Sequence, residues 1–369
     1  MTQVGGAVFS TIDHLHMARA LRLAELGLYT TQPNPRVGCV IADGERVLGE
    51  GWHQRAGEPH AEVFALRAAG EQARGATAYV TLEPCAHHGR TPPCADALIA
   101  AGVARVVVAA EDPFPAVDGR GIGKLRDAGI VVETGLMREA ARELNIGFFS
   151  RLERGRPWVR VKLAMSLDGR TALADGRSQW ITGEAARNDV QHWRARSSAI
   201  VTGSGTALAD DPRLTVRSME EGAFAPPWRV LIDSHLRVPT SAHLFDGCAP
   251  TLVLHGIGRH EAKHAGVEYV AVKERDGRID PAAALAVLGS RHCNEVLVEA
   301  GATLCGALFA AGLVDELLLY IAPVLLGDSA RPLLELPPLV DMAARWKLTT
   351  LDRKVFGEDL RLRLRPVTP

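Results

Sequence analysis

Apolar and polar positions in the first 150 residues change repeatedly between helical and strand-like spacing. Apolar residues recur at helical intervals from Met17 to Leu28, and VGCVIADGERVLGEGWH, residues 37–53, reads as a hairpin with a turn at Asp43-Gly44. Helices are predicted at 60–76, 92–102 and 123–129, and strands at 77–84, 105–110 and 130–135. This order predicts an α/β sandwich with a largely parallel sheet.

The same alternation restarts after RLERGRP, residues 151–157, which is polar and ends in proline, as an exposed link between domains would be. Strands are predicted within 158–169, 198–206, 228–235, 250–256, 267–272, 294–301 and 316–327, with helices at 183–196, 281–292 and 303–312. We therefore expect two α/β domains, 1–150 and 151–369.

Composition narrows the function classes. The 369 residues are 47% hydrophobic and 23% charged, which is ordinary globular usage. Six cysteines are too few for a secreted disulfide scaffold, and the first twenty residues lack the pattern of a signal peptide, so we expect a cytoplasmic protein with reduced thiols. No apolar run is long enough to cross a bilayer. A net charge of -1 gives no general attraction to nucleic acid, which leaves small-molecule chemistry as the default.

Two cysteines and an upstream histidine have the spacing of a catalytic zinc site. His60 and Glu62 form H-x-E, and Cys85 and Cys94 form P-C-x8-C, close to the zinc-deaminase signature with the usual P-C-x2-C stretched by six residues. We expect His60, Cys85 and Cys94 to bind Zn²⁺, which lowers the pKa of a bound water toward about 7. Glu62 would then be the catalytic proton shuttle.

Two alternatives to a catalytic zinc site remain for these residues. A lone H-x-E is common, and two cysteines nine positions apart can be ordinary packing residues. Zinc could also staple a non-catalytic binding module, which would require a fourth protein ligand. Cys39 is predicted to be a buried strand residue. Cys248, Cys293 and Cys305 have no partner spacing that would suggest a site, so core or ordinary packing is expected for all three.

Several polar residues lie where they could meet a substrate of the deaminase site. His88 and Arg90, like His87 and Thr91, belong to the loop between the two cysteines, and an arginine there can pair with phosphate. Asn34 stands between two prolines just before a strand, and His53 is a candidate rim residue. The alternative for the four loop residues is a solvated loop, and the alternative for His53 is a structural role.

The second half offers weaker signals by itself. NEVLVEAG followed by ATLCGALFAAG, residues 294–312, predicts a buried strand, a glycine turn and a helix whose N-terminal N–H groups can hold a diphosphate. Gly301 and Gly306 match neither G-x-G-x-x-G nor the P-loop, and helix packing accounts for them equally well.

The chain resembles the bifunctional riboflavin-biosynthesis deaminase/reductase family over nearly its whole length. QPNPRVGCVI, GWHQRAGEPHAEV and TLEPCAHHGRTPPCADALI resemble the deaminase half; VKLAMSLDGRTA, SQWITGEAAR, TALADDPRLTVR, VLIDS and LVEAGATLCGAL resemble the reductase half. The resemblance implies a cytidine-deaminase-like three-layer sandwich followed by a dihydrofolate-reductase-like α/β domain. It also implies two reactions, deamination of 2,5-diamino-6-(5-phosphoribosylamino)pyrimidin-4(3H)-one and NADPH-dependent reduction of the ribosyl group to ribityl.

Matching motif positions carry the family's reductase residues onto this sequence. The implied cofactor-binding residues are Ala164, Trp180, Thr206, Asp210, Ser234, Gly301, Ala302, Thr303, Leu304, Cys305, Gly306 and Ala307. The implied substrate-binding residues are Lys162, Ser178, Arg194, Leu214, Arg217 and Glu299. Lys162 and Asp211 are candidate proton donors or orienting groups during hydride transfer. Arg194 and Arg217 suit a ribose phosphate, whereas an Asp-Pro turn accounts for Asp211 equally well. No arginine can be assigned to a 2′-phosphate from the sequence.

The main alternative function is a nucleoside or RNA deaminase fused to a reductase-like domain. Neutral charge and the lack of a dense basic stripe count against polynucleotide binding. The family also implies a homo-oligomer, a dimer through the reductase domain, and no membrane partner.

Overall fold

The structure, a computed structural model, describes residues 8–86, 92–115, 117–217, 219–220, 222–259 and 264–367. The chain divides into two compact units, residues 1–154 and 155–369. The expected link begins too early, because its first four residues form the last turn of helix α6, Ile146–Arg154. No helix in these described ranges is both long and apolar enough to cross a membrane.

The first unit has six helices and five strands among its described residues. The helices are α1 Thr11–Glu25, α2 Ala61–Ala69, α3 Cys94–Ala101, α4 Arg120–Asp127, α5 Arg138–Leu144 and α6; the strands are β1 Gly38–Asp43, β2 Arg46–Trp52, β3 Thr77–Val80, β4 Arg105–Val108 and β5 Val131–Thr134. A 3₁₀ helix, Gly70–Ala73, follows α2.

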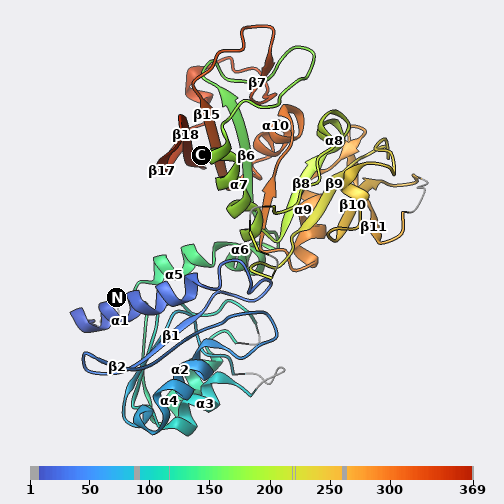
Figure 1. The fold of residues 1–369 in the computed structure, drawn as a ribbon. Helices are drawn as coiled ribbons and strands as arrows, with labels where there is room; N and C mark the ends of the chain where they lie inside the picture. The colour runs from blue at the N-terminus through green and yellow to red at the C-terminus, as the bar shows by residue number, and fades with distance from the viewer. Residues whose placement is uncertain are drawn as a thin grey trace. The chain divides into compact units, whose positions relative to one another are not determined.

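The five strands form one sheet in the order β2-β1-β3-β4-β5. Its first two strands, β1 and β2, are labelled in Figure 1. The predicted hairpin is confirmed, because β1 pairs with β2 in antiparallel register, but its turn lies one residue later, at Gly44-Glu45, since Asp43 still pairs with Arg46. The expectation of a largely parallel sheet is wrong for this unit: β1 is antiparallel to β3 as well, and only β3, β4 and β5 run parallel. The β1–β2 hairpin accounts for the difference. It reverses the chain before the crossover through α2, so β3 runs in the direction of β2 and antiparallel to β1.

Alternate residues of the strands bury side chains on opposite faces of this sheet. Cys39, Ile41 and Ala78 pack with α2, α3 and α4 on one face. Val40 and Tyr79 pack with α1, α5 and α6 on the other. This arrangement confirms the predicted three-layer α/β sandwich.

The second unit has four helices and thirteen strands among its described residues. The helices are α7 Glu184–Arg196, α8 Ser204–Asp210, α9 Pro281–Ser290 and α10 Ala302–Ala310; the strands are β6 Trp158–Ser166, β7 Arg170–Ala172, β8 Ala199–Gly203, β9 Trp228–Ile232, β10 Thr251–Gly256, β11 Val267–Val272, β12 Glu274–Arg275, β13 Arg278–Ile279, β14 Glu295–Val298, β15 Glu316–Ala322, β16 Arg331–Pro332, β17 Leu348–Phe356 and β18 Asp359–Pro366. Short 3₁₀ helices cover His243–Phe245 and Met342–Ala344.

Nine of these strands form a sheet in the order β11-β10-β9-β8-β14-β6-β15-β18-β17. The seven from β11 to β15 run parallel, and the hairpin β17–β18 adds two antiparallel strands at one edge. Helices α9 and α10 cover one face through Leu285 and Leu308, and α7 packs on the other face through Val190. The predicted second α/β domain is confirmed.

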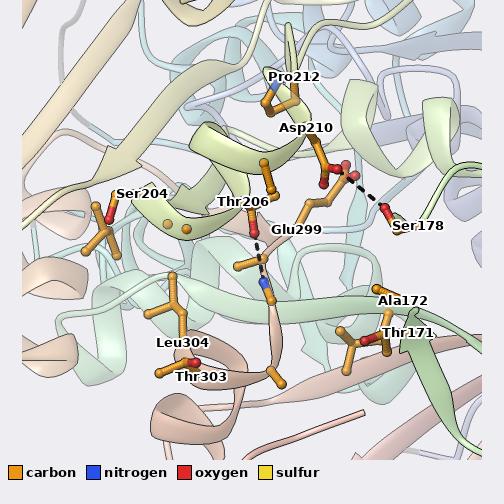
Figure 2. A pocket seen from close by; sticks show the side chains of 18 of the residues that line it. Thr171, Ala172, Ser178, Ser204, Thr206, Asp210, Pro212, Glu299, Thr303 and Leu304 are labelled. Carbon is orange, nitrogen blue, oxygen red and sulfur yellow. Dashed lines mark hydrogen bonds between the residues drawn. The ribbon is translucent and has the colours of Figure 1, made fainter. Parts of the chain in front are cut away.

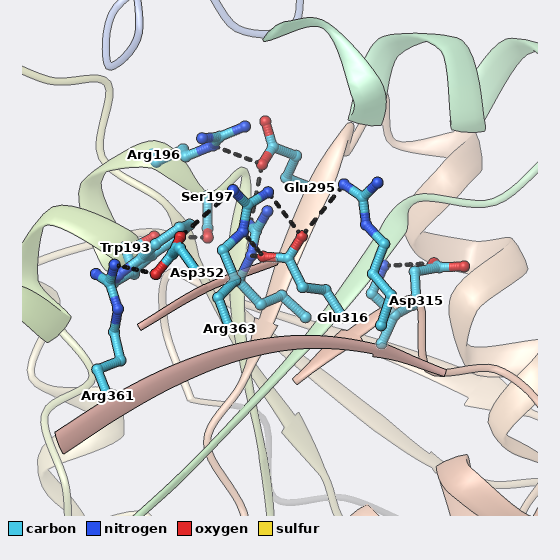
Figure 3. Close-up of polar contacts among 12 residues, drawn as sticks. Trp193, Arg196, Ser197, Glu295, Asp315, Glu316, Asp352, Arg361 and Arg363 are labelled. Carbon is cyan, nitrogen blue, oxygen red and sulfur yellow. Dashed lines mark hydrogen bonds and ion pairs between the residues drawn. The ribbon is translucent and has the colours of Figure 1, made fainter. Parts of the chain in front are cut away.

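Buried ion pairs fasten the C-terminal hairpin to the parallel sheet (Figure 3). Arg160 on β6 is fully buried; its Nε donates to Glu316 at 2.7 Å and its Nη1 to Glu295 at 3.0 Å. Arg363 on β18 also donates to Glu316, at 2.8 and 3.0 Å. A buried charge needs such partners, so β6, β15 and β18 are held in one register.

Candidate active sites

Three ligand side chains converge in the first unit. The donor atoms of His60, Cys85 and Cys94 all lie within 4.8 Å of one another. His60 is the N-cap of α2, and Cys94 is the first residue of α3. Cys85 lies in the loop five residues after β3 rather than at the strand end, and its Sγ accepts the backbone N–H of Cys94 at 3.3 Å. Two sulfurs and an imidazole are donors that suit zinc.

The pKa values of the two thiols in this cluster shift in opposite directions. Contact with Cys94, aided by His60, lowers the pKa of Cys85 to about 4. The same contact raises the pKa of Cys94. The His60 Nδ1 atom is 3.2 Å from the Cys94 sulfur and 3.6 Å from the Cys85 sulfur, so all three donors face a common point.

Glu62 lies beside this cluster but is not part of it. Its side chain is only 3% exposed, and its Oε2 has no hydrogen-bond partner within the described part of the chain. Burial raises the pKa of Glu62, and the neighbouring His60 only partly offsets the effect. An unpartnered buried carboxylate oxygen with a raised pKa suits a group that accepts and returns a proton.

Asn34 and His53 form a hydrogen-bonded pair at the edge of the cluster. The Nδ1 of His53 is 3.1 Å from the Pro59 carbonyl, which can only accept, so Nδ1 carries the proton. The Nε2 of His53 then accepts from the Asn34 amide at 3.1 Å. Burial lowers the pKa of His53, which favours the neutral form of this ring. The two predicted substrate residues are therefore brought together, with the His53 ring 5.4 Å from that of His60.

Sequence reasoning missed Glu83, two residues before Cys85. Its buried carboxylate accepts four backbone N–H groups, from Asp112, Gly119, Gly121 and Ile122, at 3.0 to 3.3 Å. These bonds tie the loop after β4 and the start of α4 to the segment that carries Cys85. The P-C pair drew attention, but nothing in the sequence indicated that the preceding acid would cap a helix 36 residues later.

The loop between the two cysteines is only partly described. His88 and Arg90, with His87 and Thr91, lie outside the described residues. The alternative of a fourth protein ligand finds no further histidine, cysteine or carboxylate in the cluster within the described residues. Cys39, Cys293 and Cys305 are buried as predicted, whereas Cys248 is exposed.

A large cavity lies at the carboxyl ends of the parallel strands in the second unit. It has a volume of about 1530 Å³ and is bordered by residues that follow β6, β8, β9 and β14 and by the start of α10 (Figure 2). Open parallel sheets bind ligands at this edge. Helix α10 has no side-chain cap, so the N–H groups of its first turn remain for an anion.

The structure places most of the implied cofactor residues on this cavity. They are Ala164, Trp180, Thr206, Asp210, Ser234, Gly301, Ala302, Thr303, Leu304 and Ala307. Thr206 accepts the Gly301 N–H at 3.0 Å, which joins α8 to the turn before α10. Two of the implied residues, Cys305 and Gly306, do not line the cavity, which corrects the expectation for them. Cys305 is buried in the core. A Cβ on Gly306 would lie 2.1 Å from the Glu335 carbonyl oxygen. A continuous run on a helix cannot face one cavity throughout.

The implied substrate residues also line the cavity: Lys162, Ser178, Arg194, Leu214, Arg217 and Glu299. The Arg194 guanidinium donates two hydrogen bonds to the Glu299 carboxylate, at 2.6 and 2.9 Å. It also donates to the Thr215 carbonyl at 2.9 Å. These bonds commit Arg194 to a carboxylate, whereas the Arg217 side chain is exposed. Ser178 donates to Asp210 at 3.4 Å (Figure 2).

Burial acts on the titratable groups at this end of the cavity. It lowers the pKa of Lys162. Burial alone would raise the pKa of Glu299, but Arg194 and Lys162 outweigh it and the net shift is downward. Asp211 adopts a positive φ of 40° at the end of α8 and its carboxylate accepts the His243 N–H at 2.8 Å. That geometry favours a turn role for Asp211 over proton donation.

The residues at the two candidate sites fit the zinc ion and the dinucleotide that the sequence implies. A histidine and two cysteines beside an unpartnered carboxylate oxygen fit a catalytic zinc site with a position left for water. A long cavity with an uncapped helix N-terminus and several cations fits a dinucleotide.

Comparison with known proteins gives the same division of the chain. Residues 10–110 match the family model for the cytidine and deoxycytidylate deaminase zinc-binding region, and residues 157–362 match that for the RibD C-terminal domain. The riboflavin biosynthesis protein RibD of Escherichia coli (strain K12) is 50% identical over 362 residues, which cover 95% of this chain and 99% of the relative.

Solved structures show similar folds over the whole chain. Acinetobacter baumannii RibD, form 1, has a TM-score of 0.91 and 47% identity and covers 97% of this chain and 99% of its own. A Thermotoga maritima diaminohydroxyphosphoribosylaminopyrimidine deaminase/5-amino-6-(5-phosphoribosylamino)uracil reductase has a TM-score of 0.87 and 32% identity, with 96% and 99% covered.

Proposed function

This chain belongs to the RibD family of bifunctional riboflavin-biosynthesis deaminase/reductases, and from that premise we propose which residues perform each reaction. The family membership expected from the sequence motifs is confirmed. The first unit is the zinc-region deaminase and the second is the reductase.

The first reaction is hydrolysis of the 2-amino group of 2,5-diamino-6-(5-phosphoribosylamino)pyrimidin-4(3H)-one. It forms 5-amino-6-(5-phosphoribosylamino)uracil and ammonia. The second reduces the ribosyl group of that intermediate to ribityl with NADPH. The observation that carries this assignment is the convergence of His60, Cys85 and Cys94 beside the buried, unpartnered Glu62.

In the deaminase unit, His60, Cys85 and Cys94 would hold zinc, which makes a bound water acidic enough to react near neutral pH. Glu62 accepts a proton from the attacking water and returns it to a ring nitrogen. As the C–N bond breaks, Glu62 takes the remaining proton of the added hydroxyl and delivers it to the departing amino group, which leaves as ammonia while the carbonyl forms. Asn34 and the neutral His53 would contact the substrate from the edge of the site, as would His88 and Arg90 of the loop.

In the reductase unit, the first turn of α10 would hold the diphosphate of NADPH, which supplies the hydride. Lys162 lies half-buried on the cavity wall with its Nζ 5.9 Å from the Tyr320 ring centroid, and we assign it to the sugar at the reacting carbon. The Arg194–Glu299 fork positions Glu299 for the substrate hydroxyls. Arg217 would pair with the 5-phosphate.

The test compares the wild-type enzyme with Glu62→Gln. We expect Glu62→Gln to lose ammonia release by roughly 10²- to 10⁴-fold, since an amide cannot shuttle the proton. Bound zinc, quantified by mass spectrometry, and NADPH oxidation with the deaminated intermediate should be unchanged. The exposed Glu71 of the same unit supplies the matched control, Glu71→Gln.

Unchanged ammonia release in Glu62→Gln would overturn the assignment of Glu62, and loss of zinc would make it a ligand or a structural support. The same assay with cytidine and adenosine-containing RNA tests the alternative substrate classes. Activity on either, without activity on the diaminopyrimidine, would overturn the proposed substrate.

We also propose that the enzyme acts in the cytoplasm as a dimer formed through its reductase unit. All six cysteines belong to the described part of the chain, and none of them forms a disulfide there, which suits a reducing compartment. Light scattering on the intact protein measures the oligomeric state, and a monomer would contradict the proposed dimer.

A further inference from the structure

The segment 211–217 runs along the reductase cavity from the end of helix α8 to helix α7. Most of its residues line the cavity, and Leu214 and Arg217 are implied substrate residues. We call this segment the substrate strap. Asp211 and Leu214 have positive φ values, 40° and 48°, which residues other than glycine keep only where their surroundings hold them. The Asp211 carboxylate accepts the His243 N–H at 2.8 Å, which anchors the first end of the strap.

Helix α7 anchors the other end of the strap. The side chain of Gln191 on α7 is only 6% exposed, and its Oε1 accepts the backbone N–H of Arg217 at 3.0 Å. Arg194, three residues further along the same helix, donates to the Thr215 carbonyl at 2.9 Å. Two buried side chains of α7 therefore fix the backbone of the strap at Arg217 and just before it.

Gln191 contacts the strap but does not line the cavity. The Arg217 side chain, in contrast, is exposed at the cavity, and no ion pair or hydrogen bond to its guanidinium occurs among the described residues. Burial raises the pKa of Glu299, and Arg217 is one of the cations that lower it, after Arg194. The Arg217 charge thus acts near Glu299, while the protein holds this arginine through its backbone.

The anchor of the Arg217 backbone bears on substrate affinity, given the proposed function, in which Arg217 pairs with the 5-phosphate. We propose that Gln191 is a positioning residue of the reductase, which fixes the Arg217 backbone and so places the guanidinium for the phosphate. An exposed arginine loses conformational freedom when it pairs with a phosphate. A fixed backbone leaves less to be ordered on binding, so the hydrogen bond to Gln191 strengthens substrate binding although Gln191 does not touch the substrate.

The test measures the reduction kinetics of Gln191→Met, which keeps the length of the side chain and removes the acceptor. The substrates are the deaminated phosphoribosyl intermediate and its dephosphorylated form, at saturating NADPH. We expect KM for the phosphorylated substrate to rise roughly three- to tenfold, as loss of one buried hydrogen bond implies, with kcat within about twofold of wild type. KM for the dephosphorylated substrate and the Kd of NADPH, measured by calorimetry, should change less than about twofold. Gln191→Glu, which keeps an acceptor, should recover part of the lost affinity.

A double-mutant cycle with Arg217→Ala tests whether Gln191 acts through Arg217. We expect Arg217→Ala to raise KM for the phosphorylated substrate by roughly tenfold or more. Adding Gln191→Met should then change KM by less than about twofold, because the group that Gln191 places is already missing. In Gln191→Met alone, the backbone N–H of Arg217 should exchange its hydrogen faster than in the wild type. Additive losses in the double variant would overturn the proposal.

Asn188→Met is the matched control. Asn188 carries an amide on the same helix, but it is exposed and does not line the cavity. Loss of the amide there should leave KM for both substrates within about twofold of wild type. An equal rise of KM in this control would show a general effect of substitution on α7 and would refute the role of Gln191.

The remaining outcomes separate this inference from the proposed function. An unchanged KM in Gln191→Met beside a raised KM in Arg217→Ala would overturn this inference alone. Equal losses for the two substrates, or a weaker affinity for NADPH, would make Gln191 a general structural residue and also overturn it. An unchanged KM in Arg217→Ala would overturn the pairing of Arg217 with the phosphate and this inference with it, whereas a wild-type enzyme that reduces neither substrate would overturn the proposed reductase function.

Discussion

At the scale of the residue, the deaminase site depends on side chains that act through others. Glu83, two residues before Cys85, is not an expected metal ligand. Its carboxylate accepts hydrogen bonds from four backbone N–H groups. The neighbouring Asp112 is buried, and burial raises its pKa to about 6. These acids shape the loop that packs beside the metal cluster.

We predict that Glu83→Gln destabilises the deaminase unit and weakens its hold on zinc. The amide nitrogen of glutamine cannot accept, so buried N–H groups lose partners at about 1–3 kcal/mol for each unsatisfied group. Chelator competition and thermal unfolding measure the two effects. Asp96→Asn, at a partly exposed carboxylate on α3, is the control, and zinc affinity equal to wild type in Glu83→Gln would contradict this role.

At the scale of the element, one close approach positions helix α10, and one set of buried ion pairs connects three strands of the large sheet. Gly306 on α10 leaves room for the Glu335 carbonyl, and Glu316 on β15 neutralises Arg160 and Arg363 from two other strands. Neither role follows from the local pattern, because in each case the partner is separated by many residues.

Gly306→Ala is expected to damage the reductase alone. Its new methyl group would lie 2.1 Å from the Glu335 carbonyl oxygen, so α10 or the segment at Glu335 must shift. Overpacking of this kind costs about 1–3 kcal/mol. Unfolding curves and NADPH affinity should both weaken, while ammonia release stays at the wild-type rate. Gly123→Ala, in open space on α4, is the control glycine, and equal effects from the two changes would refute the contact argument.

The Glu316 network predicts a specific pH dependence of stability. Burial would raise the pKa of Glu316, but Arg160 and Arg363 outweigh it and hold the pKa at about 2, below the ordinary 4.5. A lowered folded-state pKa gives stability that is present above pH 4.5 and lost as the pH falls toward 2.

We therefore expect Glu316→Gln to lower the free energy of unfolding by about 3–5 kcal/mol at pH 7, because buried Arg160 loses a charged partner. The difference between variant and wild type should shrink as denaturation is repeated at successively lower pH below 4.5. Asp328→Asn, at a fully exposed carboxylate, controls for general charge effects. A gap that is independent of pH would contradict the mechanism.

At the scale of the whole molecule, each compact unit contains its own core and its own complete candidate site. Among the described residues, the His60, Cys85 and Cys94 cluster lies wholly before residue 155, and the residues that line the reductase cavity lie wholly after it. The two chemistries should therefore be separable without separating the chain.

Zinc removal tests this independence. We expect chelation to abolish ammonia release, since the metal ligands and Glu62 then act on an unactivated water, while NADPH oxidation with the deaminated intermediate persists. Added zinc should restore ammonia release. Parallel loss of both activities would show that the reductase depends on the metal site.

The sequence determined the local elements and the chemistry of the metal site. Periodicity predicted the β1–β2 hairpin and the strand–helix order of both halves, and the spacing of His60, Cys85 and Cys94 predicted a cluster that the structure assembles. Such features depend on short segments and on donor chemistry, which the sequence carries directly.

Only the tertiary structure decided which distant residues meet. The sequence analysis missed the β17–β18 hairpin, because the arginines of these strands interrupt the apolar pattern that indicates a strand. In the structure, Glu316 and Asp352 neutralise these arginines. It also expected Arg194 to be available for a phosphate, whereas Arg194 donates two hydrogen bonds to the Glu299 carboxylate. Ion pairs and cavities are made by residues far apart in the chain, so their partners are fixed by packing and not by local pattern.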